Sequence, residues 1–206
     1  MKEKVNHIIH TLKELYPDAL CALHYQKDYE LLIAVRLSAQ CTDARVNLVT
    51  PALFEKYPTL EAMAQADIAD VENIIHSCGF FRQKAKDIVT ACQILLTEHQ
   101  GRVPDTMEQL LKLPGVGRKT ANIILGDIYH KPAVVTDTHC IRLANRMGLA
   151  VGKEPYKVEM QLAELIPPEK QSDFCHRLVL HGRAVCSARK PTCDICVLHD
   201  VCARKL

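Results

Sequence analysis

The sequence predicts an all-α protein. Helical periodicity dominates the 206 residues, since apolar side chains recur every three or four positions in one segment after another. No convincing run of alternating apolar and polar residues is present, and aromatic residues, which strands favour, make up only 5%. Apolar residues amount to 48% and charged residues to 24%, which is typical of a globular protein with a buried core.

Helical patterns begin close to the N-terminus. One face of the first predicted helix is traced by Val5, Ile8, Ile9, Leu12 and Leu15. Residues 31–37 are apolar nearly all round, as in a helix at the middle of a bundle. Thr50 and Pro51 have the residue types of an N-cap and a first helical position, so we expect a helix to restart or kink there. Residues 84–99 form the next amphipathic pattern.

The second half of the chain continues in the same way. Asp105 and Glu108 have the spacing of a capping box, before a helix expected to end near Leu113. Further helical patterns cover residues 117–129, 138–147, 156–166 and 173–185. Pro132 and the short apolar stretch 133–135 separate two of these helices and indicate a boundary between domains.

The charges are unevenly spread, although the net charge is only +2. Bases outnumber acids seven to four in residues 82–119 and six to two from residue 176 onward, whereas residues 52–72 carry five acids and one base. A near-neutral protein with such segments can present a basic face to a polyanion, but solvated helix surface explains the same pattern.

Neither a targeting segment nor a membrane span is recognisable. Residues 1–4 lead directly into the amphipathic first helix, and the longest plainly apolar run, residues 31–35, is far too short to cross a bilayer. We therefore expect a cytoplasmic protein whose ten cysteines do not form a disulfide scaffold.

Four cysteines crowd into the C-terminal segment: Cys186, Cys193, Cys196 and Cys202. Four thiolates at this spacing can hold a [4Fe–4S] cluster or a zinc ion, and unliganded thiols are the third interpretation. Arg189 and Lys190 lie in the loop between the first two cysteines. A loop pinned by a metal would hold these cations outward toward phosphate; otherwise they are ordinary surface charges.

The stretch LPGVGRKTA, residues 113–121, predicts a tight turn followed by a helix start. Gly115 and Gly117 permit positive φ and let another backbone approach closely around Val116. The amides of such a turn and of the following helix N-terminus form an anion site suited to phosphate, although a plain helix–helix turn has the same pattern.

Arg118 and Lys119 carry the wrong charge for a helix start. The helix field, the neighbouring arginine and any partial burial disfavour the ammonium of Lys119, so a neutral amine able to attack a sugar carbon becomes accessible. The alternative is an ordinary lysine that extends to water. Asp137 precedes a predicted helix and is either its N-cap or a carboxylate that stabilises positive charge or moves a proton.

Together, the hairpin, Asp137, the four-cysteine spacing and the stretch from Leu37 to Asp43 resemble the endonuclease III family of helix-hairpin-helix DNA glycosylases. The likeness runs from about residue 30 to about residue 202. It implies two helical domains flanking a DNA-binding cleft: residues 22–131 with the helix-hairpin-helix motif, and residues 1–21 plus 132–206 with a [4Fe–4S] cluster held by the four cysteines. It also implies a nucleoid-associated monomer that binds double-stranded DNA containing damaged pyrimidines or abasic sites.

The resemblance also implies roles for single residues. Lys119 matches the nucleophile that attacks C1′, expels an oxidised pyrimidine and forms a Schiff base, from which β-elimination nicks the strand. Asp137 matches the catalytic carboxylate, and Gln40 matches the residue that fills the gap left in the duplex. Phe80 matches the position of an inserted wedge, which is usually a smaller aliphatic residue, so Phe81 stays an alternative.

Two other functions fit parts of the pattern. An adenine mismatch glycosylase of the same superfamily has a catalytic glutamate in the early buried helix, and residues 31–40 contain none. A non-catalytic DNA-binding module would use the hairpin and the cysteine loop for phosphate contacts alone; the presence of both Lys119 and Asp137 argues against it. Thr136 and Val197 depart from the family pattern, which has valine and proline at these positions, but neither touches the nucleophile.

Overall fold

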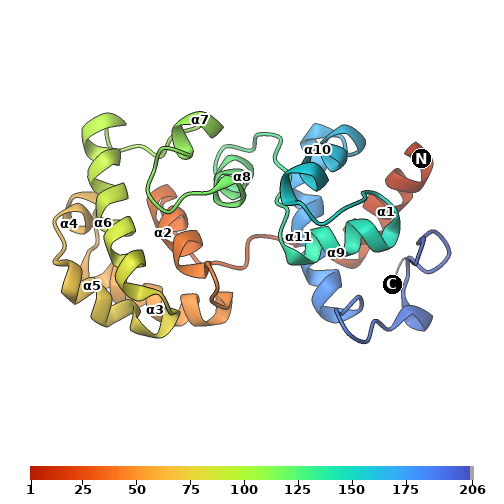
Figure 1. Ribbon diagram of the computed structural model, residues 1–206, viewed down its shortest axis with the longest axis horizontal. Helices are drawn as coiled ribbons and strands as arrows, with labels where there is room; N and C mark the ends of the chain where they lie inside the picture. Colours follow the sequence, from red (N-terminus) through yellow and green to blue (C-terminus); the bar gives the residue numbers. More distant parts are fainter. Residues whose placement is uncertain (205–206) are drawn as a thin grey trace. The chain divides into compact units, whose positions relative to one another are not determined.

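The computed structural model describes residues 1–204 and divides the chain into two compact units (Figure 1). The central unit comprises Cys21–Tyr129, and the terminal unit comprises Met1–Leu20 together with the chain from His130 onward. Every regular element in the described residues is helical, which confirms the predicted all-α class. None of the helices in this part of the chain combines the length and apolar character needed to cross a membrane.

The central unit is built around a buried helix. Its α-helices are α2 (Asp28–Ser38), α3 (Asp43–Lys56), α4 (Leu60–Ala64), α5 (Ile68–Ile75), α6 (Phe81–Glu98), α7 (Met107–Leu110) and α8 (Arg118–Asp127), with a 3-10 turn at His76–Cys78. Helix α2 packs against α3, α6 and α8. Residues 31–35 and Leu37 are buried on all sides of α2, as its apolar pattern predicts.

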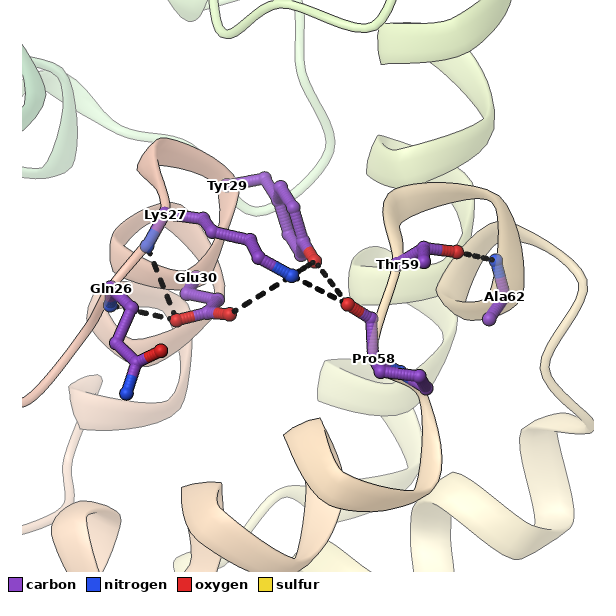
Figure 2. A network of polar contacts seen from close by, with 7 residues as sticks. All are labelled: Gln26, Lys27, Tyr29, Glu30, Pro58, Thr59 and Ala62. Carbon is purple, nitrogen blue, oxygen red and sulfur yellow. Dashed lines mark hydrogen bonds and ion pairs between the residues drawn. The ribbon is translucent and has the colours of Figure 1, made fainter.

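A polar network fixes the N-terminal end of α2 (Figure 2). The Glu30 carboxylate accepts hydrogen bonds from the backbone N–H groups of Gln26 (2.8 Å) and Lys27 (3.2 Å). Lys27 Nζ and the Tyr29 hydroxyl both donate to the Pro58 carbonyl, at 2.6 and 3.2 Å. The start of α2 is thereby tied to the turn between α3 and α4.

The terminal unit contains α1 (Lys2–Leu15), α9 (Thr138–Met147), α10 (Pro155–Leu165) and α11 (Gln171–Ala184), with 3-10 turns at Pro168–Lys170 and Cys193–Ile195. Helix α11 packs against both α1 and α9, so the two ends of the sequence share one core. The predicted apolar face of α1 is buried at Val5, Ile8, Ile9 and Leu12, whereas Leu15 is 42% exposed.

Two predictions about helix boundaries are wrong. Pro51 lies inside α3, which neither restarts nor ends there. Proline removes one backbone hydrogen bond, but the buried side chains of Val49 and Leu53 keep the helix packed on both sides of it. Helix α7 begins after Thr106, whose hydroxyl accepts from the Gln109 N–H, so the cap is not Asp105.

Candidate functional site

The predicted hairpin between α7 and α8 requires Gly115 for two reasons. Its φ is +73°, in the left-handed region that residues with a Cβ rarely adopt. A Cβ at this position would also lie 2.2 Å from Arg36 Nε and 2.7 Å from Asp87 Oδ2. The backbone of the hairpin therefore rests directly on two charged side chains.

Those two side chains form an ion pair beneath the hairpin. Arg36 donates to Asp87 Oδ2 from Nε at 2.8 Å and from Nη2 at 2.6 Å, and Gln83 Nε2 donates to the other oxygen at 2.8 Å. The side chains of Arg36 and Asp87 are only 17% and 9% exposed. Val116 is buried against a small pocket that Leu32 of α2 and Ile88 of α6 also line. The hairpin is thus fixed to α2 and α6, in part through an Arg36–Asp87 ion pair that the sequence analysis did not predict.

Helix α8 begins at Arg118 without a side-chain cap. Its N-cap is Gly117, which is exposed and has extended backbone angles. No side-chain acceptor from the cap residue meets the first amides of α8, so this helix start retains the character of an anion site.

Lys119 is the second residue of α8 and is exposed. The partial burial that the sequence left open for Lys119 is not found, because the first turn of α8 lies at the surface. The amine of Lys119 is accessible to a large substrate. Lys84 of α6 differs, since it is 1% exposed and burial lowers its pKa. That buried amine is out of reach of a sugar carbon.

Asp137 is the N-cap of α9 in the terminal unit. Its Oδ1 accepts a hydrogen bond of 2.7 Å from the Cys140 N–H, and the residue is half-buried. A negatively charged side chain at this position interacts favourably with the positive end of the helix dipole. Asp137 therefore stabilises α9, and it holds a negative charge at a defined point of the surface.

Gln40 and Phe80 occupy two turns of the central unit, and both have left-handed backbones. Their φ angles are +55° and +46°, which cost energy for residues with a Cβ. Gln40 is exposed, and Phe80 is 70% exposed. Phe81 instead packs its ring against His76, with the centroids 4.4 Å apart. Of the two phenylalanines, Phe80 is the one presented to solvent.

The four C-terminal cysteines line one pocket of the terminal unit. Arg146 Nη1 donates to Cys186 Sγ at 3.3 Å, and the Arg204 N–H donates to Cys202 Sγ at 3.4 Å. Donors of this kind stabilise thiolate ligands, so the pocket fits a thiolate-bound group. In residues 1–204, no three histidine, cysteine or acidic side chains converge closely enough to hold a single metal ion.

Arginine side chains also hold the loop that carries Arg189 and Lys190. Arg146 donates to the carbonyls of Ser187 (2.7 Å) and Ala188 (2.8 Å), and Arg142 donates to the Cys186 carbonyl at 2.9 Å. Arg189 and Lys190 themselves are exposed. The loop therefore presents its two cations to solvent while α9 holds its backbone.

Comparisons with known proteins agree over nearly the whole chain. Residues 33–168 match the HhH-GPD superfamily of base excision DNA repair proteins. The chain is 50% identical over 202 residues to endonuclease III of Synechocystis sp., which covers 98% of this chain and 92% of that protein. Endonuclease III of Escherichia coli is 41% identical over 204 residues, or 99% of this chain and 97% of that protein. A solved structure of a trapped endonuclease III–DNA covalent intermediate is similar with a TM-score of 0.92 at 40% identity, over 99% of this chain and 96% of that one.

Proposed function

The chain belongs to the endonuclease III family of the HhH-GPD superfamily, and from that premise we propose that it is a bifunctional DNA glycosylase and abasic-site lyase of base excision repair. Its substrate is duplex DNA that contains oxidised pyrimidines or abasic sites. The observation that carries the proposal is the exposed amine of Lys119 at the uncapped start of α8, on a hairpin fixed by Gly115 to the Arg36–Asp87 pair.

Lys119 is the nucleophile. The lone pair of its neutral amine forms a bond to C1′ as the bond between C1′ and the base breaks, and the base leaves with that electron pair and gains a proton. Ring opening then gives a protonated imine. Loss of a proton from C2′ supplies electrons that break the C3′–O bond, so the 3′ phosphate leaves and the strand is nicked. Hydrolysis of the imine regenerates the lysine.

Asp137 is the catalytic carboxylate in this scheme. Positive charge develops on the sugar as the base departs, and a fixed carboxylate stabilises that charge or accepts the proton from the attacking amine. Its hydrogen bond to the Cys140 N–H fixes the direction of the side chain, which such a role requires.

The remaining proposed residues bind the duplex. Amides around Gly115, Val116 and Gly117, with the start of α8, meet a phosphate. Phe80 enters the base stack as the wedge, and Gln40 fills the space of the extruded nucleotide. An enzyme of this kind must extrude its target, because C1′ and the base cannot be engaged within the stack.

The [4Fe–4S] cluster would be held by Cys186, Cys193, Cys196 and Cys202. The shared pocket and the N–H donors to two of its sulfur atoms support this ligand set. Glycosyl transfer needs no electron transfer, so the cluster has a structural part. Bound by the four cysteines, the cluster would hold the loop from which Arg189 and Lys190 would face the DNA backbone.

Borohydride trapping on abasic duplex DNA tests the proposal. The reductant converts the imine to a stable amine, so the wild-type protein should become covalently attached to the DNA, and Lys119→Ala should not. Lys112→Ala is the matched control, because Lys112 is an exposed lysine of the same hairpin segment and pairs with Glu108. Tight DNA binding by the wild type without trapping or nicking would support the non-catalytic module instead.

A further inference from the structure

Lys84 is a buried lysine that the proposed chemistry does not use. It lies on α6, and its Nζ donates to the Leu37 carbonyl at 2.8 Å and to the Cys78 carbonyl at 2.9 Å. Removing an amine from water is costly, and a methionine of similar length would pack at this position without that cost. The two hydrogen bonds are what distinguish lysine from such an apolar residue.

The first hydrogen bond holds the end of α2. The last carbonyls of a helix have no partner within it, and those at the end of α2 accept from both backbone and side-chain donors. The carbonyls of residues 35, 36 and 38 accept from the Ser38 hydroxyl, the Ala39 N–H and the Cys41 N–H. The Leu37 carbonyl accepts from Lys84. The turn that follows immediately contains Gln40.

The second hydrogen bond holds the turn that contains Phe80. The Cys78 carbonyl precedes Gly79 and Phe80, and it accepts from Lys84 Nζ. The backbone N–H of Lys84 also donates to the Phe80 carbonyl at 3.1 Å. One residue therefore bonds to the main chain on both sides of the left-handed bend at residues 79–80.

The turns that contain Gln40 and Phe80 both bond to Lys84, and they also lie next to each other. The 3-10 turn His76–Cys78 packs against α3, which begins directly after the Gln40 turn. Burial, followed by the nearby Cys41 side chain, raises the pKa of the Cys78 thiol to about 11, so the side chains of the two turns lie close to each other. A single buried amine thus fixes two adjacent turns, each with a strained residue at its tip.

We propose that Lys84 is a positioning residue that holds the turns of Gln40 and Phe80 in the geometry needed to enter the base stack together. The inference rests on the proposed function, since it assigns a purpose to the two residues taken to enter the duplex. An inserted side chain must keep its position when it contacts stacked bases. Because Lys84 bonds to both turns, it keeps Gln40 and Phe80 in a fixed position relative to each other.

Insertion can be measured without any covalent step. A duplex with a tetrahydrofuran abasic analogue, and with 2-aminopurine as the opposite base, becomes fluorescent when the opposite base is unstacked. We expect wild-type protein to raise this fluorescence, Phe80→Ala and Gln40→Ala to reduce the rise, and Lys84→Met to reduce it by at least about half. Affinity for the analogue duplex should fall about tenfold in Lys84→Met.

Single-stranded DNA separates positioning from a merely structural role, because it has no stack to enter. Borohydride trapping on single-stranded abasic DNA should change less than about twofold in Lys84→Met, while trapping on duplex falls about tenfold or more. Glu30→Gln is the matched control, since it neutralises a buried charge at the opposite end of α2 (Figure 2). It should leave the ratio of duplex to single-stranded trapping unchanged.

Two results would overturn the inference: an unchanged fluorescence rise in Lys84→Met, or equal losses on the two DNA forms. If Lys84→Met does not fold at the assay temperature, Lys84→Leu, which also lacks an N–H donor, is judged by the same two criteria at a temperature where it is folded. The proposed function fails separately, if the wild type forms no adduct on either DNA. The fluorescence assay on the uncleavable analogue still decides the role of Lys84 in that case.

Discussion

Helices α8 and α9 have the same length of ten residues but begin in opposite ways. Helix α9 begins with Asp137, whose carboxylate caps the Cys140 N–H and suits the positive end of the helix dipole. Helix α8 begins with a glycine and places Arg118 and Lys119 in its first turn, against that dipole. The residues at the start of α9 stabilise that helix. Those at the start of α8 stabilise it less than a capping residue followed by acidic residues would.

This difference shows where function is visible in a sequence. Lys119 breaks a local rule of helix stability, and the residue types alone are enough to reveal that conflict. Asp137 obeys the rule, so its capping role conceals the catalytic role that we propose for it. The two helix starts therefore need different experiments. At α9 a variant must separate the capping role of Asp137 from its proposed catalytic role. At α8 a variant must supply the side-chain cap that the helix lacks.

The largest effect is expected from separating the two roles of Asp137. Asparagine caps helices as well as aspartate does, so Asp137→Asn should change the free energy of unfolding by less than about 0.5 kcal/mol. The same variant should lose about a hundredfold to a thousandfold in the single-turnover rate of base excision, because the negative charge is gone.

Asp137→Ala is the companion variant. It should lose the cap as well, at about 1 kcal/mol of stability by urea unfolding, with a similar loss of rate. If Asp137→Asn excises bases at the wild-type rate, Asp137 serves only as the N-cap of α9. The difference between the starts of α8 and α9 would then be unrelated to a catalytic role of Asp137.

The next effect concerns the hairpin that precedes α8. Gly115→Ala forces a Cβ into a left-handed backbone and against the Arg36–Asp87 pair, so we expect a loss of about 2–3 kcal/mol in the free energy of unfolding. DNA affinity should fall with it at temperatures where the variant is folded. Gly148→Ala is a useful comparison, since that glycine also has a positive φ but lies at the end of α9. It should lose stability and retain DNA affinity.

A smaller effect is expected at the cysteine loop. Replacing both Arg189 and Lys190 by alanine should weaken DNA binding about tenfold and reduce the slope of log affinity against log salt by about one per lost phosphate contact. Lys157 of α10 is an exposed lysine that pairs with Glu154, the N-cap of that helix, and Lys157→Ala should leave the salt slope unchanged.

Removal of the cluster tests whether the whole cysteine loop, and not only Arg189 and Lys190, contributes to DNA binding. Purified protein should contain iron in the proportion of a [4Fe–4S] cluster and absorb visible light. Oxidative loss of iron should then lower DNA affinity as far as the double variant does. Iron-free protein with wild-type affinity would contradict the structural part assigned to the cluster.

The smallest effect comes from giving α8 the cap that it lacks. The backbone angles of Gly117 are ordinary extended values, and a Cβ there meets nothing within 4 Å. Gly117→Ser should therefore raise the free energy of unfolding by about 0.3 kcal/mol. Gly117→Asp should also gain stability but bind the abasic-analogue duplex about tenfold more weakly, because its carboxylate competes with phosphate. Equal affinities for the serine and aspartate variants would show that no phosphate meets this helix start.

The sequence predicted what depends on neighbours along the chain. Periodicity placed α1, α2, α6 and the helices from α8 to α11, because each buries a regular apolar face. It missed the short helices α4 and α5, whose few residues give too little periodicity. It also placed a break at Pro51, because packing overrides the local preference of a proline.

Contacts between residues far apart in the sequence could not be predicted, because periodicity and capping patterns describe only neighbouring residues. Arg36 and Asp87 are 51 positions apart, and Lys84 bonds to the Leu37 carbonyl across 47. Only a partial signal was present, namely an arginine within a helix that is otherwise apolar on all sides. The left-handed backbones of Gln40 and Phe80 had no signal, since glycine is the residue that normally marks such positions.

The most direct measurement is the position of the covalent adduct. Wild-type protein trapped with borohydride on abasic duplex DNA is digested with nuclease and protease, and the modified peptide is sequenced by mass spectrometry. We predict a reduced sugar fragment on Lys119, in the first turn of α8. An adduct on Lys84, Lys112 or the N-terminal amine would contradict the assignment, since another amine would then be the nucleophile.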